Sequence, residues 1–260
     1  VFHGHVAWLK DKCDYILIPR FMNIEKKKYI CPMFCGLIEM IISSIPHIPP
    51  LIDCAVYSLE KDKLFAWSKR AGSIVIANST KLHYAFKKAL DKQRFYHPGF
   101  HNIRFPFKVA LIGHTYNIHD GFMNMNLIKK LNHLGIGVIT SEYVNREDIE
   151  RQTCKLFKQP FWYFARQYYG AAVHLYASKK IDGIVYISAF SCGVDSVVIE
   201  LIKNATRDFP LMVLKIDEHT GEAGFDTRVE AFADMLKRRT LIDRHNSPHG
   251  KHVLGSQDIV

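Results

Sequence analysis

Nearly continuous apolar segments of strand length alternate with amphipathic helical patterns in the second half of the chain. The four segments are FKVALIG (107–113), IGVIT (136–140), IVYISAF (184–190) and LMVLKI (211–216). Continuous apolar strands are typical of a parallel sheet that helices cover on both faces. The pattern therefore predicts an open α/β sheet of Rossmann or flavodoxin type in this part of the chain.

A helical pattern follows each of these predicted strands. The first has an apolar stripe from Met123 to Leu134, with Asp120 as its N-cap and Gly135 as its end. The last is expected to begin at Thr227, where Thr-Arg-Val-Glu has the form of a capping box. Two more helices are predicted at 161–179 and 195–204, the second with an inward face of Val197, Val198, Leu201 and Ile202.

The first hundred residues show a weaker form of the same pattern. A strand is predicted at 14–19, with helices at 34–44 and 80–94. Proline and glycine at 96–99 favour a break in the chain there. The sequence thus predicts an α/β protein of two Rossmann- or flavodoxin-like lobes with mainly parallel open sheets, at 1–100 and 101–244, and an irregular tail at 245–260.

Composition is that of an ordinary globular protein, with 48% hydrophobic and 23% charged residues in a chain of 260. No apolar run reaches the roughly 18 residues of a membrane span, so we expect no membrane partner and a cytoplasmic location. The chain begins at Val1 without a methionine or a leader, which predicts a processed protein or a fragment. Six irregularly spaced cysteines favour reduced thiols or metal ligands over a disulfide framework.

The formal charge is +10, partly from basic runs at 25–28 and 237–239. Such runs attract nucleic acid, a phosphorylated ligand or an acidic partner, or they are simply a solvated surface. No helix-turn-helix, zinc-finger or RNP signature is present, which disfavours nucleic acid. The sequence also has no P-loop and no dinucleotide fingerprint, so we do not expect ATP chemistry within this chain.

Polar segments follow all four predicted strands of the second half. In an open α/β sheet a ligand binds outside the carboxyl ends of the strands, near the point where the strand order reverses. We therefore expect side chains from these segments to lie together at one edge, although the loop after residue 216 could merely shape a tight connection. The candidate substrate-binding residues are His114, Tyr116, Asn117, Asp217 and Glu218, and the candidate catalytic residues are His219 and Glu222.

Two cysteines lie in sequence contexts that favour a reactive or metal-binding thiol. Cys192, in SCGVDS, falls where a buried strand should end and a helix begin, so backbone N–H groups and the helix dipole would stabilise a thiolate. Cys31 follows an apolar run and precedes a proline, and Cys35 lies one helical turn further on. A CxxxC pair alone is weak evidence for zinc or an iron–sulfur cluster. Cys13, Cys54 and Cys154 are expected to be inert core residues.

Four segments in order, CPMFCG, LIGHTYNIHDGFMNMNLI, SAFSCGVDS and KIDEHTGEAGFDTRVEAFADML, together resemble the 2-hydroxyacyl-CoA dehydratase D-component family. The resemblance is closest to its branch related to acyl-CoA dehydratase activases. It implies two Rossmann-like lobes around an iron–sulfur cluster, four-iron four-sulfur or larger. Cys31 and Cys192 match the family's cluster ligands, and Cys35 or Cys13 is a candidate substitute for a third ligand that would precede Val1.

The resemblance also implies a function in anaerobic metabolism. The chain would accept an electron from an ATP-dependent activator protein and use it for reductive or radical dehydration of a CoA thioester, alone or as a dimer. Two alternatives stay open at this point: a non-catalytic electron-transfer or cluster-carrying module, and a zinc-containing or metal-free protein that binds a small molecule.

Overall fold

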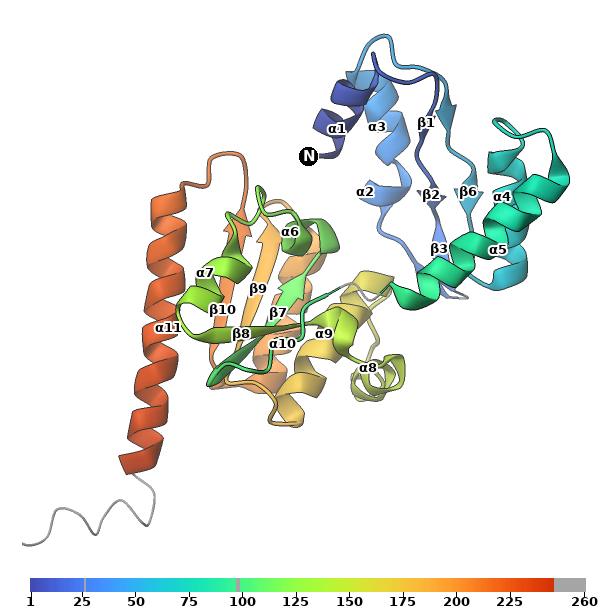
Figure 1. Ribbon diagram of the computed structural model, residues 1–260. Helices are drawn as coiled ribbons and strands as arrows, with labels where there is room; N and C mark the ends of the chain where they lie inside the picture. Colours follow the sequence, from blue (N-terminus) through green and yellow to red (C-terminus); the bar gives the residue numbers. More distant parts are fainter. Residues whose placement is uncertain (26, 97–98, 246–260) are drawn as a thin grey trace, which may run out of the picture. The chain divides into compact units, whose positions relative to one another are not determined.

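The computed structural model describes residues 1–25, 27–96 and 99–245. The chain divides into two compact units (Figure 1). Unit 1 comprises Val1–His97 with Pro160–Phe164, and unit 2 comprises Pro98–Gln159 with Ala165–Val260. The predicted α/β class with mainly parallel sheets is confirmed. From residue 246 onward, the predicted tail lies outside the described residues.

Unit 2 is built on a four-stranded parallel sheet. Its strands are β7 (Phe107–Gly113), β8 (Ile136–Thr140), β9 (Gly183–Ala189) and β10 (Leu211–Ile216). Three of them have the predicted bounds, and β9 begins and ends one residue earlier than predicted. Across the sheet the order is β10-β9-β7-β8, so the chain first moves outward from β7 to β8 and then returns to the other side of β7. This order is flavodoxin-like, with its switch point between β7 and β9.

Helices cover both faces of this sheet (Figure 1). On one face, side chains of α7 and α11 join Leu111, Val185 and Leu214 of the strands in one apolar cluster. On the other face, Tyr168 of α9 packs edge-on against Tyr186 of β9. The helical segments of unit 2 are α6 (Thr115–His119), α7 (Leu127–His133), the 3-10 turn η1 (Ser141–Tyr143), α8 (Arg146–Thr153), α9 (Tyr163–Ala177, beginning in unit 1), α10 (Gly193–Thr206) and α11 (Glu222–His245).

The helix expected after β7 begins later than predicted. The Asp120 carboxylate does accept backbone N–H groups, from Phe122 and Met123, but these close a turn and not a helix. Asn126 then adopts a left-handed backbone conformation with φ of 57°, and α7 begins at the next residue. The prediction of Asp120 as the N-cap is therefore wrong, because Asn126 holds that position, and so is the predicted start of the helix.

The last helix begins earlier than predicted. It starts at Glu222, and Phe225 in its first turn already packs in the apolar cluster. Thr227 lies inside the helix, where its hydroxyl donates to the Ala223 carbonyl, so it is not an N-cap. In α10 the prediction for Val197 was wrong as well, since this side chain is 62% exposed while Val198 is buried.

Unit 1 contains much shorter strands. β1 (Ile16–Leu17) pairs in parallel with β5 (Leu51–Ile52), β2 (Arg20–Phe21) pairs in parallel with β6 (Ala55–Val56), and β3 (Asn23–Glu25) pairs antiparallel with β4 (Lys28–Tyr29). The predicted strand at 14–19 is reduced to two residues. Its helices are α1 (Phe2–Leu9), α2 (Pro32–Cys35), α3 (Leu37–Ser44), α4 (Lys61–Gly72) and α5 (Ser79–Phe95).

The helix predicted at 34–44 is broken in two at Gly36, and the one predicted at 80–94 corresponds to α5. The Asn78 side chain caps α5 by accepting the Lys81 N–H group. The core of unit 1 is a small cluster of apolar side chains from α1, β1 and α3 with the residues next to them, including Val6, Ile16, Ile18, Ile38 and Ile41. Among the helices that the structure describes, none combines the length and apolar character needed to cross a bilayer.

Substitution of Gly113 tests the contact on which the central strands depend. A Cβ atom at this position would lie 2.2 Å from the Ile187 carbonyl oxygen on β9, and the backbone φ is +154°. We expect Gly113→Ala to lower the free energy of unfolding by about 2 kcal/mol or more, because the two strands would have to separate. Chemical denaturation measures the change. Gly193→Ala is the control, because a Cβ there meets no atom within 4 Å, and equal stability of the two variants would contradict the prediction.

Candidate functional site at the switch point of the sheet

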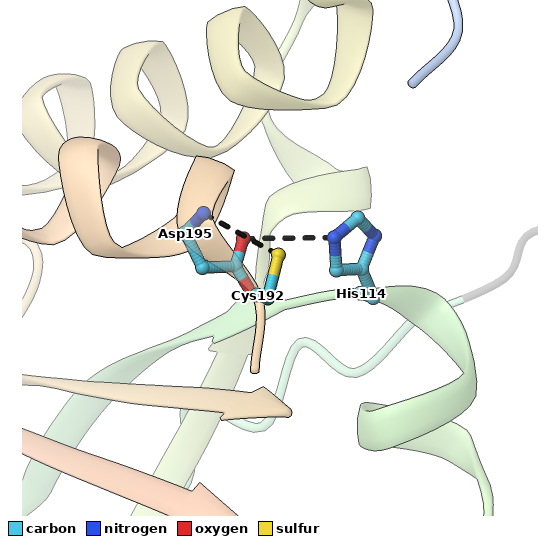
Figure 2. A group of neighbouring side chains, drawn as sticks. All are labelled: His114, Cys192 and Asp195. Atoms are coloured by element: carbon cyan, nitrogen blue, oxygen red, sulfur yellow. Dashed lines mark hydrogen bonds and ion pairs between the residues drawn. The ribbon is translucent and has the colours of Figure 1, made fainter. Parts of the chain in front are cut away.

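Three side chains that can ligate or react meet where the strand order reverses. His114 directly follows β7, and Cys192 follows the end of β9 by three residues. Asp195 lies in the first turn of α10. One imidazole nitrogen, the thiol sulfur and one carboxylate oxygen of these residues all lie within 4.8 Å of one another (Figure 2). This is the edge of the sheet at which open α/β folds bind their ligands.

His114 is held in a defined orientation. Its side chain is buried, with Nδ1 3.1 Å from the Tyr168 hydroxyl and Nε2 3.5 Å from Oδ1 of Asp195. The ring of Tyr116 stacks on the imidazole with 5.5 Å between ring centroids. Burial lowers the pKa of His114, and the nearby Asp195 carboxylate opposes this shift. A neutral imidazole at pH 7 follows, which can accept a proton or bind a metal ion.

Asp195 is a buried carboxylate, only 1% exposed, with a hydrogen bond to each oxygen. The Tyr186 hydroxyl donates to Oδ1 and the Ser188 hydroxyl donates to Oδ2, each at 2.9 Å. Tyr186 and Ser188 alternate along β9, so both project toward the face that α10 covers. Burial raises the pKa of Tyr186 well above the ordinary value, which keeps this phenol a donor. These two bonds fix the direction of the carboxylate.

Cys192 is the N-cap of α10 and is half-buried. Its sulfur accepts the Asp195 N–H group at 3.5 Å, as the position before a helix predicts. Burial nevertheless raises the pKa of the Cys192 thiol, the Asp195 charge raises it further, and the backbone N–H groups only oppose this. The backbone N–H groups of Asp195 and Val194 lower the pKa, as the helix N-terminus predicts, but they do not outweigh burial beside a carboxylate.

The predicted residues after β7 belong to this site region. Tyr116 contacts His114 directly, as described above. Asn117 is fully buried in α6, three residues after His114, and neither polar atom of its side chain has a hydrogen-bond partner in the described part of the chain. Buried amides are normally paired, so an unpaired one at the ligand edge indicates a place for water or a ligand. The structure thus brings together His114, Tyr116 and Cys192 of the predicted set, with Asn117 close in sequence.

The four predicted residues after β10 do not join the cluster. Asp217 accepts the His219 N–H group and the Thr220 hydroxyl in a tight turn. Glu218 and His219 have side chains 83% and 84% exposed. Glu222 forms an ion pair with Lys130 at 2.7 Å, on the face of the sheet that α7 and α11 cover. The expectation of one shared neighbourhood is wrong for this loop, because β10 is the outer strand and the alternative of a tight connection holds.

The predicted metal ligands fall in different units. Cys31 precedes α2 and Cys35 ends it, both in unit 1, and Cys192 is in unit 2. The Cys35 thiol donates to the carbonyl oxygens of Phe21 and Ile30, and its pKa is raised by burial and by the nearby Cys31. A shared iron–sulfur cluster of Cys31, Cys35 and Cys192 therefore stays a prediction.

Of the cysteines expected in the core, Cys13 and Cys54 are half-buried and Cys154 is exposed. The prediction of a core position was thus wrong for Cys154.

Sequence reasoning missed the residues that organise the site. Asp195 was recognised only as part of a helix start, and Tyr186, Ser188 and Tyr168 were read as strand or helix residues. Two polar side chains at alternate positions of an otherwise apolar strand, Tyr186 and Ser188, were a usable signal, because buried hydroxyls require partners. Tyr168 carried no comparable signal in its helix.

Residues 1–144, more than half of the chain, match the family described as the CoA enzyme activase uncharacterised domain. The chain belongs to this family. No curated protein matches the sequence. The matched segment contains unit 1 up to residue 97 and the first two strands of unit 2, so His114 lies within it and Cys192 and Asp195 lie beyond it.

The family assignment corrects the resemblance and the function that it implied. The family is that of a CoA enzyme activase, on the activator side of the system, and not the D-component of the dehydratase. The prediction that this chain accepts an electron from an ATP-dependent activator is therefore wrong, and so is the activator as its partner. The connection with CoA enzymes of the 2-hydroxyacyl-CoA dehydratase system is retained.

Alkylation of Cys192 tests the direction of its pKa shift. The thiolate is the nucleophile toward iodoacetamide, and burial beside Asp195 disfavours it. We expect little labelling of Cys192 at pH 7 and a rise at a higher pH than for a cysteine with the ordinary pKa of about 8.5. Mass spectrometry of the labelled peptides over a pH series measures this, with the exposed Cys154 as the internal control. Rapid labelling of Cys192 below pH 7 would contradict the assignment.

Proposed function

We propose that this chain is part of an activase for a CoA enzyme of the 2-hydroxyacyl-CoA dehydratase type, and that it acts through the cluster of His114, Cys192 and Asp195. The meeting of these three side chains at the switch point of the unit 2 sheet carries the proposal. The family supports the activase system, and the sheet order supports the place of the site. A cytoplasmic location is part of the proposal.

The chemistry of the cluster favours a site that holds a ligand or cofactor over a nucleophilic cysteine. A nucleophile needs its base directed at the sulfur, whereas Nε2 of His114 faces the Asp195 carboxylate and Nδ1 faces Tyr168. The raised pKa of the Cys192 thiol also opposes spontaneous ionisation. A thiol, an imidazole and a carboxylate that are each held in place form a set of donors prepared for a bound group.

Activation of the dehydratase component tests this function. We expect Cys192→Ala to lower the turnover of 2-hydroxyacyl-CoA, with activase and dehydratase both present, by at least about tenfold, the usual scale for loosening a bound cofactor. Cys154→Ala is the matched control, because this cysteine is exposed in the same unit and lies outside the cluster. Full activation by the Cys192→Ala protein would refute the proposed role of the cluster.

The partner surface is a separate part of the proposal. Residues 61–95 contain α4 and α5, which pack through Phe65 and Phe86 with 5.0 Å between ring centroids. We name this segment the basic hairpin, because it has nine basic and two acidic residues, a net +7 of the chain's +10. All nine basic side chains are exposed, and in the described part of the chain only Lys63 and Arg94 form ion pairs. Such a field fits an acidic surface, which we assign to the dehydratase component.

Charge reversal on α5 tests the partner surface. We expect Lys87→Glu with Lys88→Glu to weaken binding to the dehydratase component at least about tenfold at low salt, because like charges then oppose the partner. Added salt should weaken binding of the unmodified protein, since exposed charges are screened within about 10 Å at 0.1 M. The control pair is Lys179→Glu with Lys180→Glu, also adjacent and exposed but in unit 2. Equal losses in both double variants would contradict a specific role of the hairpin.

A further inference from the structure

The side chains around Cys192 are different in kind from those that hold an iron–sulfur cluster. Such clusters are held by cysteine thiolates, with imidazole replacing thiolate only on one iron of a minority class. In unit 2 the donors next to the Cys192 sulfur are the imidazole of His114 and the carboxylate of Asp195. The only other cysteine of unit 2 is the exposed Cys154. This set of one sulfur, one nitrogen and one oxygen within unit 2 fits a different metal centre.

We propose that His114, Cys192 and Asp195 bind a single Zn²⁺ ion through Nε2, Sγ and a carboxylate oxygen, with Cys192 bound as the thiolate and its proton released to solvent on binding. The inference deepens the proposed function by naming what the cluster holds, and it rests on the same residues. Zinc is a borderline-soft ion that binds sulfur, nitrogen and oxygen together, whereas magnesium and calcium prefer oxygen alone. Three protein ligands leave a fourth tetrahedral position for a ligand atom, as in zinc sites that act on substrates.

The geometry is close to what a zinc ion needs. In a tetrahedral site with bonds of about 2.0 to 2.3 Å, neighbouring donor atoms lie about 3.5 Å apart. Nε2 of His114 and Oδ1 of Asp195 already have this separation, 3.5 Å. One imidazole nitrogen, the Cys192 sulfur and one carboxylate oxygen all lie within 4.8 Å of one another.

Each proposed ligand also has a partner that orients it. The Nδ1 atom of His114, opposite the proposed metal-binding nitrogen, lies 3.1 Å from the Tyr168 hydroxyl. Tyr186 and Ser188 donate to the two oxygens of Asp195, which retain lone pairs for a metal ion. The Asp195 N–H group points at the Cys192 sulfur. Outer contacts of this type are the usual support of zinc ligands.

Zinc binding by the purified chain tests the inference. We expect about one zinc ion per chain by elemental analysis. After replacement by Co²⁺ we expect the visible d–d bands of a tetrahedral ion and a thiolate charge-transfer band in the near-ultraviolet. The variants His114→Ala, Cys192→Ala and Asp195→Asn should each raise the Kd for zinc, measured by chelator competition, at least about tenfold. The matched controls Cys154→Ala and His219→Ala remove an exposed thiol and an exposed imidazole, and they should leave the Kd unchanged.

A further variant distinguishes an unfolded protein from one that is folded but has lost a zinc-binding side chain. Asp195→Asn weakens bonds to both Tyr186 and Ser188, so circular dichroism accompanies every measurement. Tyr186→Phe keeps all three ligands and removes one orienting hydroxyl, and we expect a rise in Kd of about 10 to 100-fold. An unchanged Kd for zinc in this variant would show that the Tyr186 hydroxyl does not orient Asp195 for zinc binding.

Three results would overturn the inference. The first is iron with acid-labile sulfide that Cys192→Ala removes. The second is zinc binding lost with Cys192 but retained in both His114→Ala and Asp195→Asn, which indicates an adventitious ion on a thiol. The third is no zinc binding beyond that of the Cys192→Ala protein.

Because zinc binding is measured without a partner, zinc bound with no activation would refute the proposed function alone, and activation without zinc would refute this inference alone.

Discussion

The close approach of β7 and β9 is the contact on which unit 2 depends. At Gly113 the two backbones are so near that a Cβ atom would lie 2.2 Å from the Ile187 carbonyl. The pairing of β7 with β9 makes them the two inner strands of the order β10-β9-β7-β8 and places the switch point between them. The chain continues into α6 after β7 and into α10 after β9. His114 and Cys192, which stand at the starts of these two segments, therefore lie close together at the switch point.

Asp195 is the group around which the site is organised. A buried carboxylate loses its hydration, and hydrogen bonds must replace it. The hydroxyls of Tyr186 and Ser188 from β9 and the imidazole of His114 after β7 surround this carboxylate. Asp195 therefore connects two strands with the start of α10, and removing it would affect both the local fold and the ligands. Its position on a helix next to a strand gives the cluster a rigid support.

The features that carry the proposed function are distributed over both units. The family match covers unit 1 up to residue 97 and the start of unit 2, and the basic hairpin lies wholly within it. The cluster draws one residue from the matched segment and two from beyond it. Unit 1 carries most of the net charge on the basic hairpin, and unit 2 holds the cluster of His114, Cys192 and Asp195. This arrangement fits a division of labour in which unit 1 binds the partner and unit 2 holds the ligand or cofactor.

The sequence by itself determined the strands of unit 2, because FKVALIG, IGVIT and LMVLKI are apolar on both faces and only a covered parallel sheet accepts such segments. It also determined that Cys192 caps a helix, since the strand and the helix pattern leave little choice for the residues between them. In unit 1, by contrast, the strands are two or three residues long and leave too short a pattern to be read.

The tertiary structure alone decided which polar side chains meet. Asp195 meets Tyr186 and Ser188 because α10 covers the face of β9 from which they project, and it meets His114 because β9 lies beside β7. Neither fact is written in local periodicity. The same order places β10 at the edge, so Glu222 turns to Lys130 on the opposite face. Capping and periodicity act over a few residues, whereas the strand order depends on contacts between distant segments, and the site depends on that order.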